Sequence, residues 1–154
     1  MEHFNNQMVV EFDSVSKNES FARVVVAAFV ARLNPTLEDS ADIKTAVSEA
    51  VTNSIIHGYE NGDGRIRIET YIVEDTVTVI VTDYGVGIAD IEKAMEPMYT
   101  SKPELERSGM GFAFMEAFMD ELFVESQKGE GTKVTMRKVI RQENAEEGFE
   151  NKEI

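Results

Sequence analysis

The sequence predicts an α/β sandwich built on one hydrophobic core. Two segments alternate apolar and polar residues with the two-residue period of strands, and two longer segments have the apolar spacing of helices. Four short polar and glycine-rich motifs lie at the ends of such segments, in an order that suits a nucleotide pocket. They are Glu49–His57, Asp83–Gly87, Gly109–Gly111 and Gly129–Thr132.

A strand and a helix are predicted first. Residues 8–12 (Met-Val-Val-Glu-Phe) read as the strand, and Ser16 and Glu19 have the spacing of a capping box, which indicates the start of the helix. Arg23 lies off the apolar stripe of this helix and is expected to be exposed. The stripe predicted for the core is Phe21, Val24, Val25, Ala28 and Phe29.

A second helix is predicted from Thr36, which suits the N-cap position. Glu38 and Asp39 fall in its first turn, where the helix dipole favours acids. Gly58 and the polar run that follows it end the helix. Its predicted core stripe is Ile43, Ala46, Val47, Ala50, Val51, Ser54 and Ile55.

Two strands, a lid and a third helix follow. Residues 65–72 and 77–82 alternate as strands do, and Asp83 falls where the second strand ends. Residues 88–108 are irregular, and we expect a partly mobile lid because a span this long is unusual as a mere connector. The third helix is predicted for residues 109–120.

The last regular segments are two strands. Residues 123–126 and 133–139 have strand character around the Gly129–Gly131 turn. We therefore expect one domain over residues 1–140. The remaining residues, 141–154, are rich in glutamate and are expected to be a disordered acidic tail.

Composition excludes several classes of protein. The net charge of −14 argues against a nucleic-acid binder and suits a basic protein partner, although it also simply favours solubility. There is no cysteine, and His3 and His57 are the only histidines, which excludes a thiolate or multi-histidine metal site. Neither a secretory signal nor a membrane-spanning stretch is recognisable, so the expected location is the cytoplasm, with no membrane partner.

Three polar residues of the first motif are spaced to share one face of a helix. Glu49, Asn53 and His57 lie four residues apart, along the edge of the apolar stripe. The Asn53 oxygen would suit Mg²⁺, which bridges substrate phosphates, and Glu49 would lie within reach of a hydroxyl that approaches the γ-phosphate. The alternative is a solvated helix edge.

The second motif places a carboxylate at the end of a strand. Asp83 could accept a hydrogen bond from the exocyclic amine of adenine, and Gly85 and Gly87 would let the base approach the backbone. The alternative is an ordinary turn, in which Asp and Gly are common.

The third and fourth motifs could hold phosphates. Gly109, Met110 and Gly111 open a helix, whose N-terminus binds anions, whereas Phe114 stands where a dinucleotide-binding motif needs a third glycine. The turn that ends in Thr132 is by itself a plain hairpin turn. In the lid, phosphate contacts or a solvated loop are equal alternatives for Thr100, Ser101, Lys102, Arg107 and Ser108.

Together the motifs make the chain a candidate ATP-dependent protein kinase. In this order and spacing they resemble those of the Bergerat-fold (GHKL) ATPases, and the small anti-sigma serine kinases of endospore-forming bacteria within that family are the most similar. The resemblance covers roughly residues 8–140. It is carried most clearly by residues 18–23 (NESFAR), 47–53 (VSEAVTN), 56–61 (IHGYEN) and 100–111 (TSKPELERSGMG).

The resemblance implies a mixed, largely antiparallel sheet with helices on one face and an ATP lid. It implies that Asn53 binds Mg²⁺, that Glu49 is the general base for a serine hydroxyl and that Asp83 recognises adenine. Arg23 would contact the protein partners. The residues expected to bind ATP or ADP are Asn53, His57, Asp83, Gly85, Gly87, Thr100, Lys102, Arg107, Ser108, Gly109, Met110, Gly111 and Thr132.

The function implied is that of an anti-sigma factor. A homodimer would hold a sporulation sigma factor (sigma F type) away from RNA polymerase, and would phosphorylate a serine of an anti-anti-sigma protein. Three alternatives remain open: a sibling kinase that controls a general-stress sigma factor, a nucleotide-gated binding module without useful kinase activity, and a free-standing ATPase.

Overall fold

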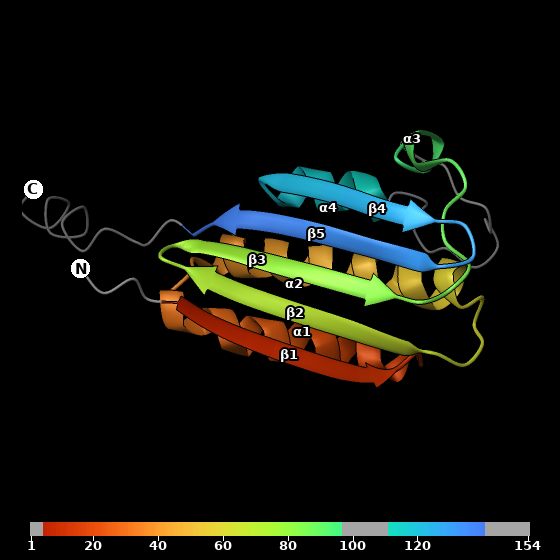
Figure 1. Ribbon diagram of the computed structural model, residues 1–154. Coiled ribbons are helices and arrows are strands. Elements are labelled where there is room, and N and C mark those ends of the chain that lie inside the picture. The colour runs from red at the N-terminus through yellow and green to blue at the C-terminus, as the bar shows by residue number, and fades with distance from the viewer. Residues whose placement is uncertain (1–4, 97–110, 141–154) are drawn as a thin grey trace, which may run out of the picture.

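Helices cover one face of a single sheet in the computed structural model, which describes residues 5–96 and 111–140 (Figure 1). The arrangement confirms the predicted α/β sandwich. In chain order the elements are β1 (Asn5–Asp13), α1 (Lys17–Val30), the 3₁₀ turn η1 (Ala31–Leu33), α2 (Leu37–Asn53), the π-helical turn η2 (Ser54–Gly58), β2 (Arg65–Val73), β3 (Thr76–Asp83), α3 (Ile91–Ala94), α4 (Gly111–Phe118), β4 (Glu121–Gln127) and β5 (Gly131–Val139).

The five-stranded sheet has the order β1-β2-β3-β5-β4. All four pairings between the described strands are antiparallel, whereas the resemblance implied a mixed sheet. In this register the last residue of β3, Asp83, lies opposite Ile66 of β2 and Thr132 of β5. The second and fourth motifs therefore meet at one end of the sheet.

The core lies between the sheet and α2, the central helix, which packs against α1 on one side and α4 on the other. The predicted α2 stripe is confirmed, because every member from Ile43 to Ile55 is buried. Each fully buried Ile or Val stabilises the fold by about 1.5–3 kcal/mol relative to an exposed one. The strands contribute Ile66, Ile68, Ile72, Val77, Val79 and Val81, all 0–1% exposed.

The stripe predicted for α1 is only partly confirmed. Val25 and Phe29 pack against the core, whereas Phe21 and Val24 are 47% and 65% exposed. The fully buried residues are Ala22, Val26 and Val30. Residues 21–30 are almost all apolar, so the sequence fits two adjacent helix phases equally well. The exposed position expected for Arg23 is confirmed.

Both predicted helix starts are confirmed, but only one of the two predicted side-chain caps forms. The Thr36 hydroxyl accepts a hydrogen bond from the Asp39 N–H at 3.0 Å and caps α2. The capping box at Ser16 does not form, because Ser16 has a helical backbone (φ −59°, ψ −28°) and its side chain caps nothing. The Glu19 carboxylate instead accepts from the Thr52 hydroxyl at 3.1 Å and joins α1 to α2.

Several predictions lie outside the described residues. They concern the lid from residue 97 onward, the first two residues of the third motif and the acidic tail. Before that part of the lid, Asp90 caps the short helix α3 by accepting from the Lys93 N–H. Within residues 5–96 and 111–140, no helix is both long and apolar enough to cross a membrane.

Candidate nucleotide site

The first motif ends in a π-helical turn. The Tyr59 N–H donates to the Ser54 carbonyl oxygen at 2.9 Å, which closes a turn one residue wider than an α-helical turn. Glu49 and Asn53 lie on α2, and His57 lies within the wider turn; all three are half-buried. The straight row predicted from α-helical spacing therefore holds from Glu49 to Asn53 and changes phase before His57. Single π turns of this kind are frequent at functional sites.

Asp83, at the end of β3, is only 4% exposed. The Ser54 hydroxyl donates to its Oδ2 at 2.9 Å, the Gly85 N–H donates to its Oδ1 at 3.0 Å, and the backbone N–H of Thr132 donates to the same carboxylate. Burial raises the pKa of Asp83 above its ordinary value, and the three hydrogen bonds lower it by less. Sequence reasoning missed the role of Ser54, although a serine within an apolar stripe was the signal.

The hydrogen bonds of Asp83 leave room for one more donor. A carboxylate offers about four lone-pair sites, and Ser54, Gly85 and Thr132 occupy three of them. A further donor, such as the exocyclic amine of adenine, could bond to the remaining site. A titratable group buried this deeply is also typical of a functional position.

Glycines let the backbone segments around Asp83 come close together. A Cβ at Gly58 would lie 2.9 Å from the Asp83 carboxyl atoms, and one at Gly85 would lie 2.0 Å from the Gly58 carbonyl oxygen. Gly131 has a φ of 110°, and a Cβ there would lie 2.1 Å from the Asp83 carbonyl oxygen. Gly87, at φ 75°, comes equally close to the Gln127 carbonyl oxygen, 2.2 Å from the position of a Cβ. The end of α2, the second motif and the fourth motif therefore fit together only with glycines at these positions.

Ser126 joins the fourth motif to the start of the lid. Its hydroxyl donates to the Gly131 carbonyl oxygen at 2.9 Å and accepts from the Ile88 N–H at 2.7 Å. The same oxygen lies 2.8 Å from the Thr132 hydroxyl. Sequence reasoning missed Ser126, because a serine in an edge strand carries no local signal of such contacts.

Asn53 brings the first and third motifs together. Gly111 is buried at the start of α4, and a Cβ there would lie 3.0 Å from both the Nδ2 and the Oδ1 of Asn53. Among residues 5–96 and 111–140, no group of three or more His, Cys, Asp or Glu side chains could hold a metal ion. If the Asn53 oxygen holds Mg²⁺, phosphate oxygens and water could supply its other ligands, as they commonly do at nucleotides.

Of the remaining predicted site residues, Arg23 lies within the described part of the chain and the others lie outside it. Arg23 is an exposed residue of α1. The predicted phosphate contacts outside the described residues are Thr100, Ser101, Lys102, Arg107, Ser108, Gly109 and Met110.

Comparison with known proteins identifies the family. A family model described as the histidine kinase-like ATPase domain matches residues 16–138. The chain is 64% identical to the anti-sigma F factor of Clostridium beijerinckii over 135 residues, which are 87% of this chain and 94% of that protein. The chain belongs to the anti-sigma F factor family. The anti-sigma F factor of Clostridium kluyveri is 62% identical over 89% of this chain and 96% of its own length.

Solved structures share the fold of this anti-sigma F factor family member. The crystal structure of the RsbU and RsbW domains of Rv1364c from Mycobacterium tuberculosis matches with a TM-score of 0.64 and 20% identity, over 90% of this chain and 35% of that one. The catalytic domain of the histidine kinase ThkA matches with a TM-score of 0.53 and 19% identity, over 88% and 99%. At these identities the likeness supports the fold, a histidine kinase-like ATPase domain.

Proposed function

We propose that this protein is a cytoplasmic anti-sigma factor that binds a sigma factor of the sigma F type and phosphorylates a serine of an anti-anti-sigma protein with ATP. The observation that carries the proposal is the meeting of three motifs. Asn53 lies against Gly111 at the start of α4, and the same helix end contacts Asp83 through Ser54. The name shared by the relatives supports the anti-sigma part of the proposal.

The residues fit ATP at both of its ends. The remaining acceptor site of Asp83 would bind the adenine amine, with Gly85, Gly87 and Thr132 beside it. The Asn53 oxygen would hold Mg²⁺, which neutralises phosphate charge when bound. We assign further phosphate contacts to His57 and to the predicted residues of the lid and of the α4 start.

Glu49 would act on the protein substrate. It lies one helical turn before Asn53, so its carboxylate would be near a serine hydroxyl that approaches the γ-phosphate. In the transfer step the carboxylate accepts the hydroxyl proton while the serine oxygen bonds to phosphorus and ADP leaves. Such transfer depends mainly on positioning and charge neutralisation, which matches a site with one carboxylate base.

The exposed surface of α1 would meet the protein partners. Arg23 is exposed on this helix, and Phe21 and Val24 of the same helix are 47% and 65% exposed. Exposed apolar residues and arginine are typical of protein interfaces. We include a homodimer in the proposal, on the basis of the family resemblance.

The test is transfer of labelled phosphate from ATP to the anti-anti-sigma protein of the same organism. Glu49→Gln should keep nucleotide binding and lose about 100-fold or more in transfer rate, since general bases contribute about 10²–10⁴-fold. Glu38→Gln, at an exposed position on the same helix, is the matched control and should leave the rate unchanged.

Three other outcomes would change the proposed mechanism or the proposed function. Unchanged transfer in Glu49→Gln removes that residue from the mechanism. A wild type that binds nucleotide and sigma factor but transfers no phosphate is a binding module. Steady phosphate release without a protein acceptor indicates a free-standing ATPase.

A further inference from the structure

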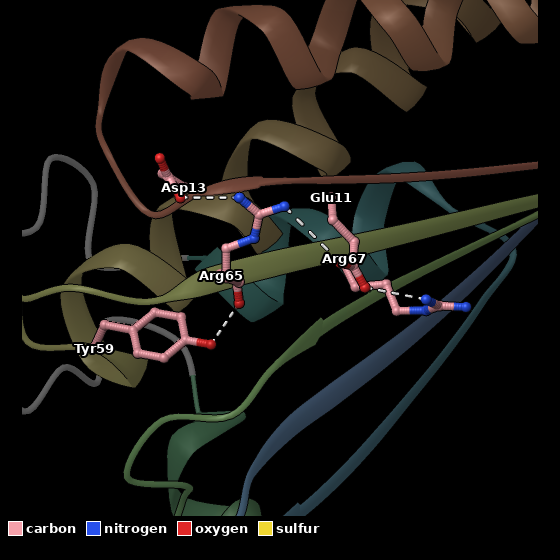
Figure 2. Close-up of polar contacts among 5 residues, drawn as sticks. All are labelled: Glu11, Asp13, Tyr59, Arg65 and Arg67. Carbon is pink, nitrogen blue, oxygen red and sulfur yellow. Dashed lines mark hydrogen bonds and ion pairs between the residues drawn. The ribbon is translucent and has the colours of Figure 1, made fainter.

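Tyr59 bridges two strand ends beside the candidate site. Its hydroxyl accepts a hydrogen bond from the Tyr84 N–H at 2.8 Å and donates one to the Arg65 carbonyl oxygen. Figure 2 shows the phenol ring with its hydroxyl pointing at that oxygen. Tyr84 follows the last residue of β3 and Arg65 is the first residue of β2, so one hydroxyl joins the exit of one strand to the start of its neighbour.

The ring itself has little freedom to move. A Cβ on Gly64 would lie 2.4–2.6 Å from the ring atoms of Tyr59, so the ring packs directly on the Gly64 backbone. The Tyr59 N–H is bonded to Ser54, and its carbonyl oxygen accepts from the Gly62 N–H at 2.7 Å. The position of the hydroxyl is therefore fixed by the packing of the ring and by the backbone hydrogen bonds of Tyr59.

The turn after Asp83 is held by three consecutive N–H groups. The Tyr84 N–H donates to the Tyr59 hydroxyl, the Gly85 N–H to the Asp83 carboxylate, and the Val86 N–H to the Gly58 carbonyl oxygen at 2.9 Å. Two of these acceptors, from Gly58 and Tyr59, belong to the end of the helix that carries Asn53. The helix end thus fixes the turn directly on both sides of Gly85.

We propose that Tyr59 is a positioning residue for nucleotide recognition. By holding the Tyr84 N–H, its hydroxyl keeps the turn, and with it the Asp83 carboxylate, in the arrangement that leaves one acceptor site for the exocyclic amine of a purine. Tyr59 then sets discrimination between a purine with this amine and one without it. This inference rests on the proposed function, because it takes the Asp83 site to bind the base.

The test compares two ligands in three proteins. Dissociation constants for ADP and for inosine diphosphate, which lacks the amine, are measured by calorimetry on wild type, Tyr59→Phe and Tyr71→Phe. Tyr59→Phe keeps the ring on Gly64 and removes only the hydroxyl. Tyr71→Phe makes the same chemical change at a half-buried position within β2, away from Asp83.

We expect Tyr59→Phe to weaken ADP binding roughly three- to tenfold, the range of one hydrogen bond, and inosine diphosphate binding by less than twofold. The ratio of the two affinities should therefore fall, and the Tyr84 amide proton should shift upfield in the NMR spectrum. Tyr71→Phe should change neither. Gly64→Ala, which displaces the ring but keeps the hydroxyl, should lower the ratio by the same route.

Two results separate failure of this inference from failure of the proposed function. If wild type prefers ADP to inosine diphosphate but Tyr59→Phe keeps that preference, or loses both affinities equally, Tyr59 does not position the acceptor. If wild type binds no ADP, or binds both nucleotides alike, Asp83 does not read the base, and the proposed adenine site fails together with the inference.

Discussion

Asp83 is a carboxylate that the fold shields almost completely from water. Burial raises its pKa, and the hydrogen bonds from Ser54, Gly85 and Thr132 compensate only in part. The native state therefore bears a free-energy cost for keeping this group charged at neutral pH. A cost of this kind is typical of residues retained for function rather than for stability.

The sign of the pH effect follows from the raised pKa. The native carboxyl binds its proton more tightly than the unfolded one, whose value is near 3.8. The stability that comes from this tighter proton binding is fully present below pH 3.8. It is lost as the pH rises through the native pKa of Asp83. Urea unfolding of wild type and Asp83→Asn between pH 3.5 and pH 7 should show wild type losing stability relative to the variant. A constant difference over this range would contradict the raised pKa.

The same substitution should weaken nucleotide binding. An Asn at this position could still accept from the Gly85 N–H and donate to the Ser54 oxygen, so the fold should tolerate it. It would lose acceptor capacity for the base, which we expect to weaken ADP binding by about 10- to 100-fold, as for one hydrogen bond to a charged group. Calorimetric titration is the measurement. Asp75→Asn, in the exposed turn between β2 and β3, is the control and should bind ADP normally.

At the scale of elements, two glycines shape the β4–β5 hairpin: Gly129 lies in the turn, and Gly131 is the first residue of β5. Gly129 and Gly131 both have positive φ, of 85° and 110°, but a Cβ at Gly129 would meet nothing within 4 Å. A Cβ at Gly131 would meet the Asp83 carbonyl oxygen. Substitutions at the two positions therefore distinguish the free-energy cost of a positive φ from the cost of a steric clash with β3.

Alanine at each position should measure these costs. Gly129→Ala should cost about 1–2 kcal/mol of unfolding free energy from its backbone conformation alone. Gly131→Ala should cost about 1–3 kcal/mol more, because β5 has to move away from β3. Urea unfolding gives both values, and ADP binding should weaken only in Gly131→Ala. Equal costs would mean that the close approach at Gly131 is relieved without moving the strand.

Elements with a strong local signal were predictable from the sequence. The alternation in β2 and β3, the stripe of α2 and the Thr36 cap all depend on neighbours within a few residues, and the structure confirms them. The phase of α1 was not predictable, because its segment is apolar on every side and only packing against α2 selects Ala22. The π turn was missed because it differs from an α-helix by a single hydrogen-bond step.

The site shows the same division. Its motifs were recognisable, but the partners that hold them were not. Ser126 contacts Ile88, and Tyr59 contacts Tyr84, across 38 and 25 residues of sequence. Such pairs exist only after the strands have found their register, and nothing in the local sequence specifies them.

At the scale of the whole molecule, a nucleotide bound at the proposed site would touch both layers. Asn53 and Ser54 come from the helical layer, whereas Asp83 and Thr132 come from the sheet. Binding should therefore stabilise the native state as a unit. At 100 times its dissociation constant, ADP should add about 2.7 kcal/mol, which raises the melting temperature by roughly 5–11 °C in a domain of this size.

Thermal unfolding monitored by circular dichroism tests this expectation. Asp83→Asn at the same ADP concentration is the control and should show a smaller rise. A rise that is equal in both proteins would place the bound ADP somewhere other than the Asp83 pocket.

The pairing of β3 with β5 also has a consequence for the protein during its synthesis. β3 ends at Asp83, whereas the third donor to that carboxylate, Thr132, is made 49 residues later. Strand pairings this distant form late in folding, after the local hairpins. A chain still emerging from the ribosome therefore has an incomplete Asp83 site until β5 is free to join the sheet. Under the proposed function, the completed protein binds nucleotide and the nascent chain does not. Only the completed protein is therefore protected from proteolysis by the bound nucleotide.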